Sequence, residues 1–84
     1  MLLAAIDIGT NAVRLFFSNA FYRNGQVVIE KASLMRIPIR LGEDVFVNKN
    51  ISEEKIVRLS KTMQAFKLLI DVNQPLAYKA CATS

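Results

Sequence analysis

The sequence contains no histidine and a single cysteine, and both scarcities exclude chemistry. Without histidine, the chain offers no imidazole as a general base or as a metal ligand. The single cysteine, Cys81, excludes a disulfide within the chain and a zinc site built from several cysteines. Because Cys81 lies in an apolar stretch, we expect it to be a small buried hydrophobic residue.

Long hydrophobic runs are also missing. The apolar residues at the start of the chain are interrupted by Asp7 and follow no basic segment, so we expect no signal peptide. No stretch has the length of apolar sequence that a membrane-spanning helix requires. We therefore expect a cytoplasmic protein without a membrane partner.

The rest of the composition is that of a small globular protein. The 84 residues suffice for one domain, and 52% of them are hydrophobic. A chain of this length buries a modest share of its surface, so its core is small. The net charge of +4 is compatible with a polyanionic ligand but identifies none.

An unbroken apolar run opens the chain and is followed at once by turn-forming residues. Residues 2–6 are all apolar, which predicts a strand buried on both faces. A glycine and two polar residues then precede a second apolar stretch, which starts at Ala12. The simplest structure for this order is a strand, a tight turn and another strand.

Asp7, Gly9, Thr10 and Asn11 give this turn its chemical character. Gly9 permits a backbone conformation, or a close approach, that a side chain would block. Thr10 and Asn11 add a hydroxyl, an amide and main-chain donors that could hold phosphate oxygens, with Asp7 facing a metal-bound water. The same residues would also suit an ordinary hairpin turn that the Asp7 carboxylate closes by hydrogen bonds.

Residues 12–22 are rich in aromatic and branched side chains and predict the second strand. Alternation places Val13, Leu15 and Phe17 on one side of that strand and Arg14 on the other. Arg14 either extends along the strand end with its guanidinium in water or reaches back over the turn toward a phosphate.

The stretch from Asp7 to Leu15 resembles the first phosphate motif of the exopolyphosphatase/guanosine-pentaphosphate phosphatase (Ppx/GppA) family. That family belongs to the superfamily of actin-like ATPases, sugar kinases and Hsp70. Thr10 stands where the family usually has serine and keeps the hydroxyl, whereas Ala12 replaces a frequent second serine and loses one. The phosphate-binding residues that the resemblance implies are Gly9, Thr10, Asn11 and Arg14, and it makes Asp7 a candidate magnesium contact through water.

Two later segments resemble further signatures of the same family. Residues 40–42 match an arginine-leucine-glycine signature, although by themselves they would be read as a basic loop with a glycine turn. Arg36 and Arg40 could line a path for a polyanionic substrate. Residues 82–84 match the start of a signature that continues with alanine, so we expect the chain to be the N-terminal part of a longer lobe.

Asn24 and Gly25 lie between two apolar runs, which predicts a tight hairpin. The third strand should therefore pair antiparallel with the second, over about residues 26–37. Charged residues interrupt its apolar pattern, which indicates an edge strand or a partly wet face. Pro38 cannot donate a backbone hydrogen bond and should end the pairing.

A long amphipathic helix should follow, with Ser52 as its N-cap. Its basic residues, among them Lys55 and Arg58, should form a solvated face rather than a nucleic-acid site. The predicted apolar stripe comprises Ile56, Leu59, Met63, Phe66 and Ile70. Residues 76–84 predict a fourth strand, which should lie parallel to a neighbour because a helical crossover precedes it.

The expected fold is therefore α/β, a single partial domain over residues 1–84. The resemblance implies a ribonuclease H-like (actin-like ATPase) lobe fragment with a mixed sheet. Strands one to three should be antiparallel, and a crossover helix should lead to a parallel fourth strand beside the first. The remainder of the first lobe and the second lobe would be absent.

The resemblance also implies an activity for the parent protein. Family members remove a terminal phosphate from inorganic polyphosphate or guanosine pentaphosphate, use magnesium, and are commonly homodimers. The family's catalytic glutamate lies downstream, and Glu43 and Glu54 do not occupy its position, so the chain alone should be inactive. No residue here reads a base, and both substrates remain open.

Two other functions fit the same sequence. A sugar or acetate kinase-like ATPase of the superfamily would use the same first turn to bind ATP. A small non-catalytic domain would instead assemble through open sheet edges and exposed apolar surface.

Overall fold

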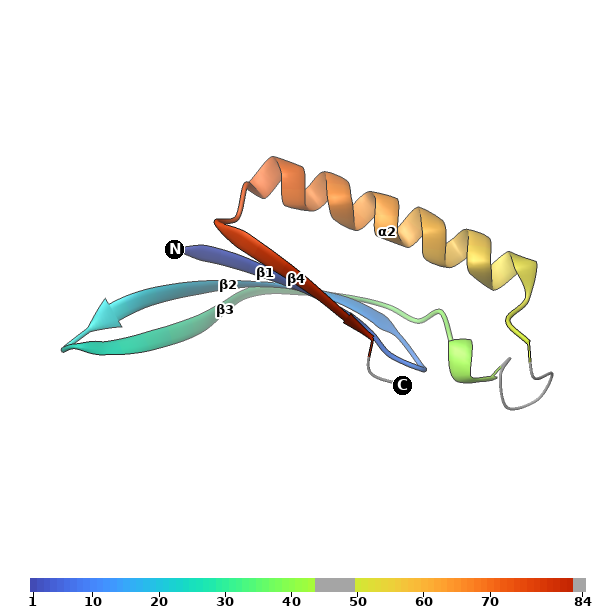
Figure 1. Cartoon of the computed structure of the whole chain (residues 1–84), viewed down its shortest axis with the longest axis horizontal. Helices are drawn as coiled ribbons and strands as arrows, with labels where there is room; N and C mark the ends of the chain where they lie inside the picture. The colour runs from blue at the N-terminus through green and yellow to red at the C-terminus, as the bar shows by residue number, and fades with distance from the viewer. Residues whose placement is uncertain (44–49, 83–84) are drawn as a thin grey trace.

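The computed structural model describes residues 1–43 and 50–82 as one sheet with a long helix packed on it (Figure 1). The strands are β1 (Leu2–Ile8), β2 (Val13–Arg23), β3 (Gln26–Ile37) and β4 (Ala77–Ala82), and the helix is α2 (Glu53–Asn73). The sheet order is β3-β2-β1-β4. β2 pairs antiparallel with both β1 and β3, whereas β4 pairs parallel with β1. The predicted mixed sheet and helical crossover are confirmed.

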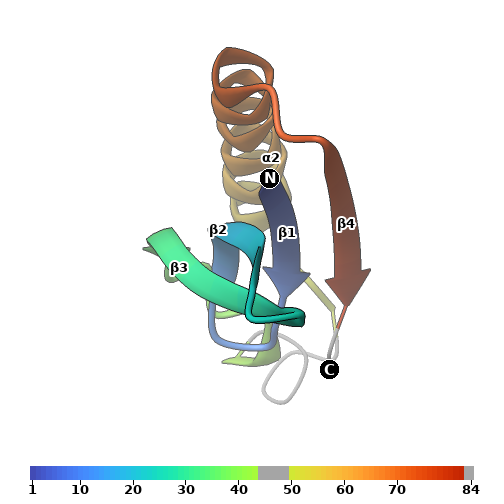
Figure 2. The same cartoon turned by 90° about the vertical axis from the view of Figure 1, so that its left-hand side faces the viewer.

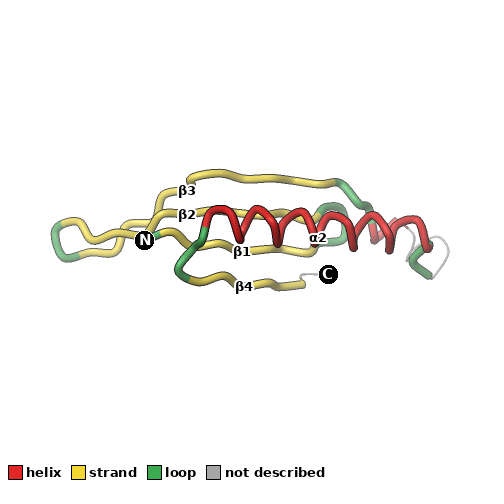
Figure 3. Tube along the Cα trace, turned by 90° about the horizontal axis from the view of Figure 1, so that it is seen from above, coloured by secondary structure: helices red, strands yellow, loops and turns green. Residues whose placement is uncertain are grey.

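The hairpin between β2 and β3 turns at the predicted residues. Asn24 and Gly25 have φ angles of 54° and 77°, and a two-residue turn with both centres left-handed suits the twist of the flanking strands. β3 ends at Ile37, directly before Pro38, as the missing amide of proline requires. The hairpin extends past the start of β1, which gives the molecule its elongated outline (Figures 1 and 3).

The core lies between α2 and one face of the sheet (Figure 2). Its strand residues alternate along β1 and β2, as a strand buried on one face requires. They are Ala4, Ile6, Val13, Leu15 and Phe17. Phe66 and Ile70 of α2 pack against them, and Ile39, only 1% exposed, completes the core from the segment after β3. By the same alternation, Asp7 and Arg14 lie on the face that α2 does not cover.

The start of α2 is the predicted one. Ser52 is the N-cap, and the amide of Lys55 donates a hydrogen bond to its hydroxyl oxygen at 3.3 Å. At the other end, the amide of the left-handed Gln74 donates to the Ile70 carbonyl at 2.9 Å. Within the described parts of the chain, no helix is both long and apolar enough to span a membrane.

The predicted apolar stripe of α2 is only partly buried. Phe66 and Ile70 are core residues, and Leu59 and Met63 pack at its margin. Ile56 is 54% exposed, so its predicted place in the core is wrong. Together with Leu59 and Met63, it lines an apolar groove along α2 that no other described segment fills.

β4 is an edge strand, and all six of its residues are exposed. The expectation that Cys81 is buried is therefore wrong, because the thiol lies on this open strand. The physical reason is that β4 pairs on one side only, while α2 lies above β1 and β2 rather than above β4 (Figure 2). Thr83 and Ser84, which belong to the third predicted signature, lie outside the described residues.

Candidate functional site

The turn between β1 and β2 is held by three backbone hydrogen bonds. The amide of Gly9 donates to the carbonyl of Ala12 at 2.9 Å and closes the turn on itself. The amides of Gly42 and Arg40 donate to the carbonyls of Thr10 and Asn11, at 2.8 and 2.9 Å respectively. The first two predicted motifs, which lie far apart in the sequence, are therefore in direct contact.

These hydrogen bonds also set the direction in which the turn's own amides point. The described peptide bonds are trans, and in a planar trans peptide the N–H and C=O groups point in opposite directions. Because the carbonyls of Thr10 and Asn11 point at residues 40–42, the N–H groups of Asn11 and Ala12 point the other way. Two successive amides on one side of a turn form a small nest for an anion.

A small cavity of about 190 Å³ lies at this turn. Its lining residues are Asp7, Gly9, Thr10, Asn11, Ala12 and Arg14. The structure therefore brings together the four residues predicted to bind phosphate and the predicted metal contact. The backbone of Gly9 is not left-handed, so conformation does not explain a glycine at this position. The other predicted reason, room for a ligand to approach the backbone, still applies.

Asp7 and Arg14 are cross-strand neighbours and form an ion pair. The register of β1 and β2 places them opposite each other, and Arg14 Nη1 lies 3.5 Å from Asp7 Oδ2. The Arg14 side chain is 43% exposed and the Asp7 side chain is 25% exposed. Water screens such a pair, which contributes at most about 1 kcal/mol to stability. The pair thus orients the guanidinium at the cavity while leaving it accessible to an anion.

Several known proteins are similar to this chain in sequence or in fold. No family model matches the sequence. A Ppx/GppA phosphatase of Aquifex aeolicus, in its type II variant, superposes with a TM-score of 0.77 at 29% identity, over 98% of this chain and 26% of that chain. Another structure, of the Aquifex aeolicus PPX-GPPA enzyme, has a TM-score of 0.76 at 31% identity, over 100% and 27% of the two chains. The chain is similar in sequence and in fold to part of the Ppx/GppA phosphatases.

Further relatives support the fold. An exopolyphosphatase of Cytophaga hutchinsonii superposes with a TM-score of 0.79 at 23% identity, over 100% of this chain and 26% of that chain, and shows the same fold. Together with the Aquifex aeolicus structures, this confirms the predicted ribonuclease H-like, actin-like ATPase lobe fold. Among curated proteins, the bifunctional 3-dehydroquinate synthase/phosphatase of Fusobacterium nucleatum is 38% identical over 71 residues, which are 83% of this chain and 11% of that protein. The chain thus spans about a quarter of the length of these solved structures.

A second cavity, of about 470 Å³, adjoins the turn through Asn11. Arg36, Pro38, Arg40 and Glu43 complete its lining. Arg36 lies opposite Arg14 in the register of β2 and β3, so both guanidinium groups start from the same face of the sheet. The second cavity therefore extends the positive surface beyond the turn, although Glu43 Oε2 lies 4.0 Å from Arg40 Nη1.

A magnesium site was expected from the resemblance. The described residues contain no group of three or more side chains of the types that hold a metal ion. Asp7 is the carboxylate in the lining of the turn cavity. Magnesium is often bound by one or two carboxylates together with waters and phosphate oxygens. Asp7 therefore suits magnesium as one contact of several, with phosphate supplying others.

Two basic residues of α2 make contacts that the sequence pattern did not predict. The pattern placed Lys55 and Arg58 on a solvated face of the helix, and Arg58 is indeed exposed, while Lys55 is half-buried. Lys55 Nζ donates to the carbonyl of Arg40 at 2.8 Å, and Arg58 Nη2 donates to the carbonyl of Pro38 at 3.3 Å. Helical periodicity contains no signal for such contacts, because their acceptors are backbone atoms of a distant segment.

Proposed function

We propose that the natural protein containing this chain is a phosphatase that removes the terminal phosphate from inorganic polyphosphate or guanosine pentaphosphate. The observation that carries this proposal is the cavity at the turn, whose lining includes the backbone of Asn11 and Ala12 and the side chain of Arg14. Phosphate oxygens accept hydrogen bonds from backbone amides and from a guanidinium, and a charged donor makes the stronger bond. Solved relatives described as exopolyphosphatases and Ppx/GppA phosphatases support the same reaction class.

In this proposal, each group of the turn cavity has a role. Gly9 permits the phosphate to approach the backbone, and Thr10 and Asn11 donate hydrogen bonds to its oxygens. Arg14 offsets the negative charge that the phosphoryl group carries during transfer. Magnesium, held in part through Asp7, would offset further charge.

The chain alone is proposed to be inactive. Phosphoryl transfer to water also needs a group that orients the attacking water and accepts its proton. In the family this group is a glutamate that lies downstream of the matching signatures. We therefore propose that residues 1–84 are one partial domain that forms one side of the phosphate site.

The surroundings of the turn suggest how a long substrate is held. Arg36 and Arg40 line the neighbouring cavity and would contact phosphates that precede the terminal one. We further propose a cytoplasmic homodimer that acts on these small polyanions, with no nucleic-acid or membrane partner.

Phosphate release by the full-length natural protein tests the proposal. Polyphosphate, guanosine pentaphosphate and ATP are supplied separately, with and without magnesium. We expect release from polyphosphate or the pentaphosphate and a dependence on magnesium. Hydrolysis of ATP alone would contradict the proposal and favour the kinase-like ATPase.

A pair of variants links the activity to the site. Arg14→Gln should lower kcat/KM about 100-fold, the order expected when one preorganised donor to a developing charge is removed. Arg23→Gln is the matched control, because Arg23 lies at the far hairpin over the Phe21 ring and outside the turn cavity. Equal activity in both variants would exclude Arg14 from phosphate binding. Turnover by the isolated 84 residues that Arg14→Ala abolishes would contradict their inactivity.

A further inference from the structure

Residues 38–42, between β3 and α2, connect the helix to the phosphate turn. On one side, the amides of Arg40 and Gly42 donate to the carbonyls of the turn. On the other side, Lys55 and Arg58 of α2 donate to carbonyls of the same segment. Ile39 anchors the segment in the core, since it is 1% exposed. The segment is thus fixed both to the helix and to the turn.

Arg40 is the residue at which these contacts meet. Its φ of 61° is left-handed, a conformation that costs a residue with a side chain on the order of 1–2 kcal/mol. Its amide donates to the carbonyl of Asn11. Its carbonyl accepts from Lys55 Nζ at 2.8 Å and, more weakly, from the amide of Glu43 at 3.2 Å, so Lys55 is its charged donor. A strained backbone of this kind persists only where the surrounding contacts determine it.

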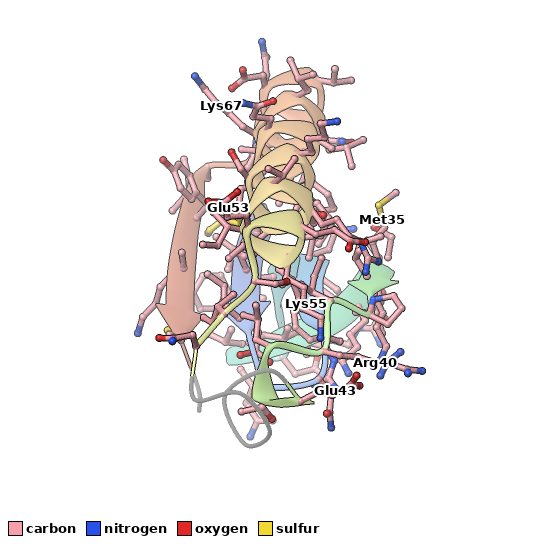
Figure 4. All side chains as sticks on the ribbon, turned by 90° about the vertical axis from the view of Figure 1, so that its right-hand side faces the viewer. Met35, Arg40, Glu43, Glu53, Lys55 and Lys67 are labelled. Atoms are coloured by element: carbon pink, nitrogen blue, oxygen red, sulfur yellow. The ribbon has the colours of Figure 1, made fainter. Side chains whose placement is uncertain are left out.

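Lys55 has the stronger of the two helix contacts. Its 2.8 Å bond to the Arg40 carbonyl is shorter than the 3.3 Å bond from Arg58 to Pro38, and both donors are charged. The Lys55 backbone is held by the Ser52 cap. Lys55 is also partly buried, whereas Arg58 is exposed. Figure 4 shows Lys55 at the start of α2, on the side where Arg40 lies.

We propose that Lys55 is a positioning residue for the phosphate site, an inference that rests on the proposed function. By holding the Arg40 carbonyl, the ammonium group keeps the amides of Arg40 and Gly42 on the carbonyls of the turn. Those two bonds in turn direct the N–H groups of Asn11 and Ala12 at the cavity. The start of α2 therefore fixes the direction of the N–H groups that would bind phosphate, without contacting the ligand itself.

Removing the ammonium group has a defined consequence. The Arg40 carbonyl loses its charged partner, so the left-handed conformation loses one of the contacts that determine it. The peptide groups of residues 40–42 can then rotate away from the turn. A small misplacement of groups that bind a reacting phosphate is enough to lower the rate substantially, because catalysis of this kind depends on positioning.

The test compares Lys55→Met with Lys61→Met in the full-length natural protein. Both changes remove one ammonium group from α2, and Lys61 is exposed, with no hydrogen bond or ion pair to the residues that the structure describes. We expect Lys55→Met to lower kcat/KM on the order of tenfold, with Lys61→Met unchanged. Lys55→Arg should restore part of the loss, because a guanidinium can donate to the same carbonyl.

A second measurement reports the position of the segment directly. Hydrogen–deuterium exchange should become faster at the amides of Arg40 and Gly42 in Lys55→Met, while exchange in β2 stays as in the wild type. A merely stabilising lysine would instead speed exchange throughout the sheet. If Lys55→Met does not fold, Lys55→Gln, which keeps a polar side chain, takes its place in both measurements.

These readouts separate the two proposals. If the wild-type protein releases phosphate and Lys55→Met matches it in both rate and exchange, the positioning role is wrong and the phosphatase stands. If the wild type releases no phosphate from any substrate, the phosphatase is wrong. The exchange measurement, together with the affinity for tripolyphosphate, then decides the role of Lys55. Faster exchange at Arg40 and Gly42 with weaker tripolyphosphate binding supports it, and any other result overturns it.

Discussion

Four described residues have a left-handed backbone, and only one of them is a glycine. They are Asn24, Gly25, Arg40 and Gln74. Asparagine and glycine tolerate this conformation well, so the hairpin turn carries little strain. Arginine and glutamine tolerate it less well, and hydrogen bonds hold both residues in place. The amides of Arg40 and Gln74 donate to backbone carbonyls, and the Arg40 carbonyl also accepts from Lys55. The distribution separates turns that the residue type favours from turns that contacts impose.

Gly25→Ala tests the first kind of turn. A Cβ at Gly25 would meet no other atom within 4 Å, so the whole effect comes from its φ of 77°. We expect a loss of about 1 kcal/mol in the free energy of unfolding, measured by urea denaturation. Asn24→Gly, at the neighbouring position, is the control and should be neutral or slightly stabilising. A loss of similar size in both variants would show that side-chain contacts, not φ, matter at this turn.

At the scale of elements, the beginning of α2 has both a structural and a proposed functional role. Ser52 caps the helix by accepting a hydrogen bond from the amide of Lys55, and the Lys55 side chain holds the segment next to the turn.

Ser52→Ala should cost about 1 kcal/mol in unfolding free energy, the usual value for a lost N-cap. Ser60→Ala, within the same helix, should be neutral or stabilising, because alanine is the better helix former. Thermal unfolding of the two variants measures the difference.

The elements themselves were largely predictable from the sequence. The hairpin residues, the end of β3 before Pro38 and the Ser52 cap follow from local chemistry, and the structure confirms all three. The exposure of Cys81 was not predictable, because it depends on what packs over β4 and not on β4 itself. A strand pattern indicates which residues alternate, but not whether both faces are covered.

The site shows the same division. The resemblance and the local sequence identified the turn and Arg14, and the structure gathers them around one cavity. The contact of residues 40–42 with the turn, and the hold of Lys55 on Arg40, remained hidden because both use backbone atoms. Every residue has a backbone carbonyl, so no sequence motif indicates which carbonyl will accept a side-chain hydrogen bond.

At the scale of the whole molecule, the described part of the sheet leaves apolar surface and strand edges uncovered. The sheet face opposite α2 carries partly exposed apolar residues, and β4 has no strand beyond it in the described chain. Unpaired edges of this kind bind other strands readily. This exposure is the observation that favours the non-catalytic assembly domain as a second candidate function.

We therefore expect the 84-residue chain to associate as its concentration rises. Sedimentation velocity at increasing concentration, without any phosphate ligand, measures the association. Ala80→Lys should weaken it, because a lysine on an edge strand opposes pairing with another edge. Val72→Lys is the control, since Val72 is an equally open position on α2, 79% exposed and away from the edge. Association that Val72→Lys relieves and Ala80→Lys does not would locate it on the helix.

The parallel pairing of β1 with β4 has a consequence for synthesis on the ribosome. β1 is made first, yet its partner β4 is the last strand of the described chain. The hairpin of β2 and β3 involves near neighbours and can form as soon as it emerges. At roughly 5–20 residues per second, one edge of β1 stays open for seconds while the helix and β4 are translated. Until β4 arrives, the strand that carries Asp7 can therefore pair with a wrong partner.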